Sequence, residues 1–149
     1  MPGLPDVTIG DRRIPVMWPS SFAARYALAA AATRGGDPIM VSMAALGMCW
    51  PTRGRLRMLA AQGEDVSGVP ALRHPFEPGE DIPRFGARVL DELEGAGLDP
   101  NELVTAGAAL VDPLALSAVV REREGSPVGI EEAATERADF TGPRAVAAT

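Results

Sequence analysis

The only cysteine and the only histidine of the chain, Cys49 and His74, form its single candidate thiol–imidazole pair. A catalytic cysteine must become a thiolate, which requires exposure and a positive neighbourhood. Cys49 instead lies in the apolar stretch "MAALGMCWP" (43–51), between Met48 and Trp50. We therefore expect Cys49 to fill space at the end of a buried helix, and His74 to be solvated in a loop.

The remaining polar residues predict no catalytic, cofactor-binding or metal-binding site. Zinc usually takes four nitrogen or sulfur ligands, and one Cys and one His supply two. The acidic run Asp91, Glu92 and Glu94 cannot converge on one point from a helix, and we expect it to form a solvated face. Two carboxylates that meet in space for general acid–base catalysis remain open.

All 14 basic residues are arginines, because the sequence contains no lysine. This excludes a Schiff-base lysine and the lysine of a phosphate-binding loop. Two basic runs occur, Asp11–Arg13 and Arg53–Arg57. We interpret both as solvated faces, with a contact to a phosphate or an acidic partner as the alternative.

Charge and hydropathy narrow the class of partner. The net charge of −6 opposes binding to nucleic acid. The longest mostly apolar stretch, 39–50, is too short for a membrane span and favours a buried helix. One cysteine makes no internal disulfide, and the first residues lack the pattern of a secretory signal, so we expect a cytoplasmic protein.

The elements that must position these residues are mostly helical. Alanine is abundant and aromatic residues make up only 5% of the chain, which favours helices whose small residues approach closely. At the N-terminus, alternation predicts a β-hairpin that turns at Gly10 and Asp11, with apolar faces formed by Val7 and Ile9 and by Ile14, Val16 and Trp18.

Capping signals predict an antiparallel helix pair after the hairpin. The first helix begins at Ser20 or Ser21 and stops at the glycine pair 35–36, with Phe22, Tyr26 and Ala29 or Ala30 on one face. Asp37 and Pro38 then open the second helix as its cap and first residue. A short helix over 55–62 and a long irregular loop from Gly63 to Pro83 follow.

The clearest helical pattern begins at Phe85, with Val89, Leu90 and Leu93 at helical spacing before the glycines at 95 and 97. Asp99 and Pro100 open the next helix, where Glu102 fits a capping box and Leu98 can staple to Leu103. The pair Asp112–Pro113 starts a new helix or kinks the same one. A short helix over 129–140 and a frayed tail over 141–149 complete the prediction.

The predicted fold class is therefore mainly α, with an N-terminal β-hairpin followed by about five helices in one domain over residues 1–140. Within this layout the internal methionines all lie in the first half of the chain, where they suit an irregular core or an adaptable binding surface: Met17, Met40, Met43, Met48 and Met58.

The layout resembles a known family. Val7, Ile9, Gly10, Pro15 and Val16 form a "V-x-I-G-x-x-x-x-P-V" pattern, which is followed by "AALGMCW" (44–50) and by "FGARVLDELEGAGLDPNELVTAGAAL" (85–110). Over roughly residues 5 to 140 the chain resembles the tail assembly chaperones of bacteriophages and gene-transfer agents. The resemblance implies a non-enzymatic, oligomeric protein of the host cytoplasm that keeps the tape-measure protein soluble and recruits tail-tube subunits.

Two alternatives come from other classes. A structural virion component, such as a connector or minor tail protein, would remain in the virion tail. A small cysteine-dependent enzyme would use Cys49. For the binding function, we expect contact through hydrophobic helix faces or through the central loop.

Overall fold

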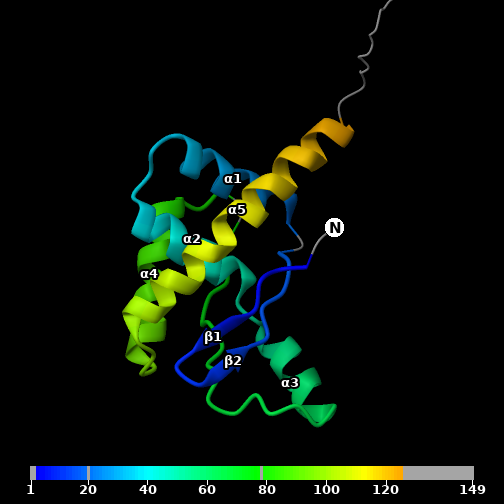
Figure 1. Cartoon of the computed structure of the whole chain (residues 1–149), viewed down its shortest axis with the longest axis vertical. Helices are drawn as coiled ribbons and strands as arrows, with labels where there is room; N and C mark the ends of the chain where they lie inside the picture. Colours follow the sequence, from blue (N-terminus) through cyan, green and yellow to red (C-terminus); the bar gives the residue numbers. More distant parts are fainter. Residues whose placement is uncertain (1–2, 20, 78, 126–149) are drawn as a thin grey trace, which may run out of the picture. The chain divides into compact units, whose positions relative to one another are not determined.

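The protein is mainly α-helical, as the sequence predicts, with a two-stranded antiparallel hairpin followed by five helices in the described residues. A computed structural model describes residues 3–19, 21–77 and 79–125. The chain divides into two compact units, Met1–Ser117 and Ala118–Thr149. Figure 1 shows the elements of the first unit: β1 (Val7–Ile9), β2 (Arg12–Ile14), α1 (Phe22–Thr33), α2 (Pro38–Cys49), α3 (Arg53–Ala61), α4 (Ile82–Gly95) and the start of α5 (Pro100–Gly125).

The hairpin pairs its strands through the predicted turn. Val7 lies opposite Ile14 and Ile9 opposite Arg12, with Gly10 at a positive φ of 66° in the turn. The apolar side chains of both strands are buried. The second strand is shorter than predicted, since it ends at Ile14, and Val16 lies beyond it.

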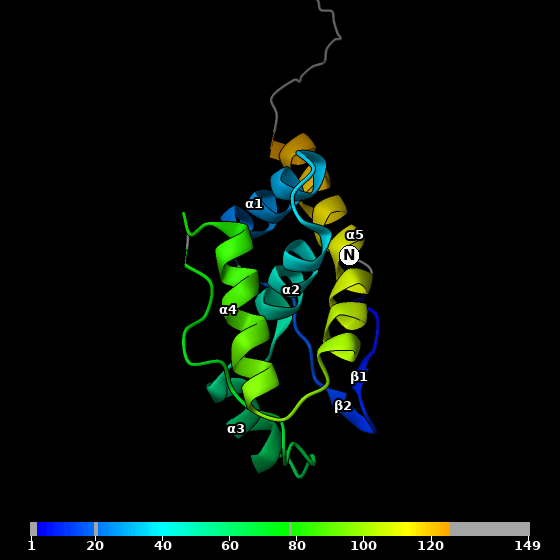
Figure 2. The ribbon, with the colours of Figure 1, turned by 90° about the vertical axis from the view of Figure 1, so that its left-hand side faces the viewer.

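Helix α2 is the centre of the core. Its predicted start is confirmed, because the side chain of Asp37 accepts from the amide of Ile39 at 3.0 Å and Pro38 is the first helical residue. Every residue from 41 to 50 is buried. A helix that is apolar on all sides needs neighbours on several faces. In Figure 2, α4 and the first part of α5 lie on opposite sides of α2.

Glycines let these helices approach α2 at backbone distance. A Cβ on Gly86 of α4 would overlap the carbonyl oxygen of Met40, and one on Gly107 of α5 would overlap that of Ser42. Both neighbours are backbone atoms, which cannot rotate away. The close packing of small residues expected from the composition is therefore present on both sides of α2.

Helix α1 buries a different face from the one that carries Tyr26. Ser21 caps the helix, accepting from the amide of Ala24 at 3.2 Å, but Tyr26 is 48% exposed. The buried face consists of Ala24, Arg25 and Leu28 instead. Arg25 donates to the Ser117 hydroxyl at 3.5 Å.

The predicted role of Glu102 is wrong, although Asp99 does accept from the amide of Asn101 at 3.2 Å near the start of α5. The Glu102 carboxylate accepts from the backbone amide of Gly10 in the hairpin turn, rather than closing a capping box. This contact ties the hairpin to α5. The helix then continues through Pro113 as one element.

The middle of the chain differs from the prediction only at its boundaries. Helix α3 begins at Arg53, and α4 begins at Ile82 with Asp81 as its first flanking residue, so the connecting loop is slightly shorter than predicted. The helix predicted over 129–140, the tail over 141–149 and the end of the predicted domain lie outside the described residues.

Candidate functional site

A pocket of about 520 Å³ lies within the first unit, where α2 ends and α3 begins. Four segments form it: the chain before α1 with the cap residue Ser21, Ala24 of α1, the end of α2 with the start of α3, and the central loop. Its lining residues are Met17, Trp18, Pro19, Ser21, Ala24, Gly47, Met48, Trp50, Pro51, Thr52, Arg53, Gly54, Leu72, Arg73, Pro75 and Phe76. Its volume falls within the usual range of ligand pockets.

Backbone and capping contacts hold the first walls of this pocket. The amide of Met17 donates to the carbonyl of Cys49 at 2.9 Å, which fixes the chain before α1 against the end of α2. Pro51 follows α2, and the Thr52 hydroxyl accepts from the amide of Arg55 at 3.1 Å as the cap of α3. Pro51 and Thr52 thus end α2 and begin α3 beside the pocket.

The central loop supplies another wall of the pocket, and its residues contact α4 and the end of α2. The indole nitrogen of Trp50 donates to the carbonyl of Pro70 at 2.6 Å. The amide of Arg73 donates to the Glu92 carboxylate at 2.8 Å. Phe76 packs edge-on against the buried Phe85 ring, with 5.1 Å between centroids. These contacts bring the loop residues 72–76 to the pocket.

Arg88 of α4 anchors the same loop. Its guanidinium donates to the backbone carbonyl of His74 and forms ion pairs with Glu80 at 3.2 Å and Glu92 at 3.4 Å. The three side chains of these ion pairs are 19–27% exposed. The guanidinium also lies 4.9 Å from the centre of the Phe85 ring. One cation thus joins the loop, the helix and the aromatic pair.

The pocket combines an apolar surface with positive charge. Its floor and walls carry tryptophan, methionine, leucine, proline and phenylalanine side chains, and Arg53 and Arg73 are the charged residues in its lining. The described lining contains no Asp or Glu. Both arginines also border a second depression, whose lining includes Asp91 and Glu92 of α4.

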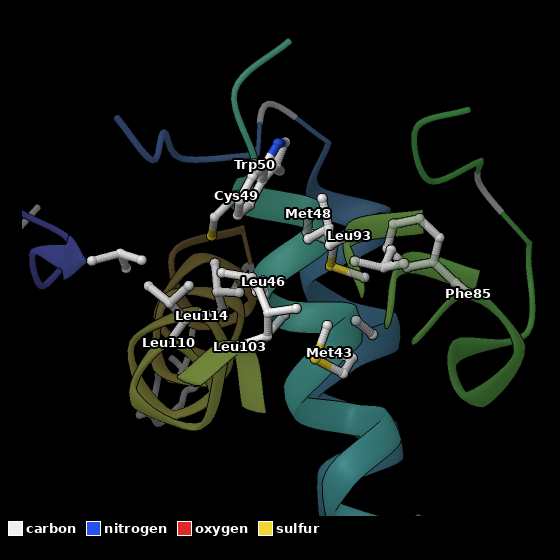
Figure 3. Packing of buried hydrophobic residues seen from close by; sticks show 14 of the residues in the cluster. Met43, Leu46, Met48, Cys49, Trp50, Phe85, Leu93, Leu103, Leu110 and Leu114 are labelled. Carbon is white, nitrogen blue, oxygen red and sulfur yellow. The ribbon is translucent and has the colours of Figure 1, made fainter. Parts of the chain in front are cut away.

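Cys49 is a packing residue, as predicted. Figure 3 shows its sulfur directed towards the α5 leucines, on the same side of α2 as Leu46, while Met48 lies on the side of Phe85. The side chain is fully buried and free of any disulfide. Burial raises the pKa of the thiol from 9.0 to about 12, so the thiolate needed for nucleophilic chemistry is not formed at neutral pH.

The other polar candidates lie apart from this pocket or serve the loop. His74 is exposed, as predicted, and is held through its backbone carbonyl. Asp91 and Glu94 are exposed, but Glu92 is not the solvated residue that we expected, because it binds Arg88 and the Arg73 amide. The described residues contain no group of three or more His, Cys, Asp or Glu side chains that could hold a metal ion.

Two contributors to the pocket were missed in the sequence. The first is Trp18, which was expected on a strand face, and the second is the segment 72–76, because the central loop was expected as a binding candidate without any residue of it being named. Its apolar residues Leu72 and Phe76 stand among prolines and charged residues, where no periodicity marks them. Aromatic and aliphatic residues inside a polar loop were the available signal.

No helix in the described part of the chain has the length and hydropathy needed to cross a bilayer. No protein-family model matches this chain, no curated protein matches it, and no solved structure matches it.

Proposed function

We propose that the protein is a non-enzymatic tail assembly factor of a phage or gene-transfer agent, which binds a tail protein through the apolar pocket. The pocket is the observation that carries this proposal, and the family resemblance supplies its biological setting. The tape-measure protein and the tail-tube subunits are the proposed partners, and the host cytoplasm is the proposed location.

The chemistry of the pocket supports binding rather than catalysis. Apolar side chains that line a pocket gain about 25 cal/mol for each Å² that a partner removes from water. Trp18, Met17 and Leu72 are only partly buried, so they still have surface to cover. Methionine side chains adapt to different ligand shapes, which suits a protein that holds extended apolar segments.

The Cys49 thiol argues against the cysteine-enzyme alternative. It faces α5 within the core, and its raised pKa keeps it protonated. A cysteine nucleophile needs the opposite surroundings, with access to solvent and a neighbouring positive charge.

Co-expression with candidate tape-measure and tail-tube proteins, followed by affinity purification, tests the proposal. Gly54→Phe is the pocket-blocking variant, because Gly54 lines the pocket and a Cβ there meets no atom within 4 Å. Leu116→Ser is the matched control, since Leu116 is 61% exposed and lies outside the pocket. We expect a tail protein to co-purify with the native chain and the control, and to be lost from Gly54→Phe.

Failure of both tail proteins to co-purify with the native chain would refute the proposal. Electrophoresis of purified particles distinguishes an assembly factor from the remaining alternative, a structural component of the virion. An assembly factor is absent from finished particles, whereas a connector or minor tail protein is retained in them.

A further inference from the structure

The two arginines of the pocket suggest which segment it accepts. We propose that the pocket selects a peptide segment in which an apolar side chain stands beside a carboxylate, with Arg53 and Arg73 binding the carboxylate. This inference rests on the proposed function, because it names the class of partner for the same site.

The charge of the pocket is opposite to that of the chain. The whole sequence has 20 acidic and 14 basic residues, yet the described lining of the pocket holds two arginines and no acidic residue. Both arginines are exposed, and neither takes part in an ion pair among the described residues. Guanidinium groups bind carboxylates through paired hydrogen bonds, so these two side chains complement an acidic ligand.

Within the described residues, the two acidic residues of the second depression form no ion pair with Arg53 or Arg73. Glu92 uses one oxygen for the backbone amide of Arg73 and the other for Arg88. Asp91 is exposed on α4, borders the second depression and is absent from the lining of the pocket. Arg53 and Arg73 belong to the same lining as the apolar side chains, so a bound segment with a carboxylate beside an apolar side chain would meet both kinds of residue.

A peptide fits these observations better than an anionic membrane surface. The apolar residues line a pocket of about 520 Å³, which accommodates a few side chains. The net charge of −6 repels an extended anionic surface, whereas a short segment meets only the local positive charge.

Both tryptophans of the chain, Trp18 and Trp50, line the pocket, so intrinsic fluorescence reports its occupancy directly. The test uses two short blocked peptides that lack tryptophan, one of alternating leucine and glutamate and the other with glutamine in place of glutamate. We expect the glutamate peptide to bind the native chain about tenfold more tightly at low salt, as two exposed ion pairs allow. Added salt should reduce this preference.

The double variant Arg53→Gln, Arg73→Gln should bind both peptides equally. Arg57→Gln is the matched control, because Arg57 is exposed on the same helix as Arg53 but does not line the pocket. It should keep the native preference. Thermal melts establish that each variant is folded.

Equal binding of the two peptides by the native chain would overturn this inference. Failure of the native chain to bind either peptide would overturn it as well. Binding to phosphatidylglycerol vesicles without binding to the glutamate peptide would also overturn it. The proposed function fails separately, when no tail protein co-purifies. A co-purification blocked by Gly54→Phe but unchanged by the double arginine variant would refute the peptide preference alone.

Discussion

Substitution of one glycine in α4 tests the packing that places the pocket. Gly86→Ala adds a single methyl group at the contact between α4 and α2. That methyl would overlap the carbonyl oxygen of Met40 and stand 2.9 Å from its carbonyl carbon. Because the obstacle is backbone, the two helices must move apart, and the buried contacts of Phe85 and Val89 must loosen.

Two opposing effects determine how much Gly86→Ala changes the free energy of unfolding. Overpacking of a core costs about 1 to 3 kcal/mol, and the upper part of this range applies because no side chain can turn aside. Alanine stabilises the helix by about 1 kcal/mol relative to glycine, because its helix propensity is higher. We expect a net loss of about 2 kcal/mol in the free energy of unfolding. For a chain of this length, that lowers the melting temperature by about 4 to 8 °C.

Gly95→Ala is the control in the same helix. A Cβ on Gly95 meets no atom within 4 Å, so this variant should be as stable as the native chain or more stable by up to about 1 kcal/mol. Urea denaturation followed by circular dichroism measures both variants. A Gly86→Ala variant as stable as the native chain would show that α2 and α4 are not in backbone contact.

Two further predictions concern Cys49 and Arg88. Cys49 should resist alkylation in the folded protein and react after unfolding. Since its folded pKa is raised to about 12 from 9.0, its contribution to stability is complete below pH 9 and is lost as the pH rises towards 12. The unfolding free energy should fall by about 1.4 kcal/mol per pH unit in this window, and Cys49→Ala should remove that part of the slope; an unchanged slope would contradict the burial of the thiol. Arg88→Gln should lower the unfolding free energy by about 1 to 2 kcal/mol in urea titrations, because it breaks the ion pairs and the His74 contact that hold the loop. It should also weaken binding of a tail protein, whereas Arg84→Gln on the exposed part of the same helix should do neither, and a stable Arg88→Gln variant with intact binding would show that the loop needs no such anchor.

The sequence was sufficient for the elements whose signals are local. Asp37 with Pro38 and the serine at position 21 mark helix starts through contacts within one turn, and both are present. The mostly apolar run of α2 predicted its burial, and with it the role of Cys49. Local caps and uniform hydropathy leave few competing arrangements.

These local patterns could not predict contacts between residues that are far apart in the sequence. Glu102 has the right spacing for a capping box, but a hairpin amide 92 residues away takes its carboxylate. Phe22 and Tyr26 share one face of α1 by their spacing, but Ala24 and Leu28 are the residues buried in the core, and Tyr26 is 48% exposed. The pocket joins four segments that no periodicity connects, so only the fold could bring them together.

Hydrogen–deuterium exchange of the protein, alone and in complex with the tail protein that the proposed function predicts to co-purify, tests the central claim most directly. If the partner occupies the apolar pocket, binding should slow exchange at the amides of 52–54 and 72–74, while the exposed amides at the end of α3 remain unchanged. Protection confined to the exposed surface around Leu116, with no change at the pocket, would contradict the account.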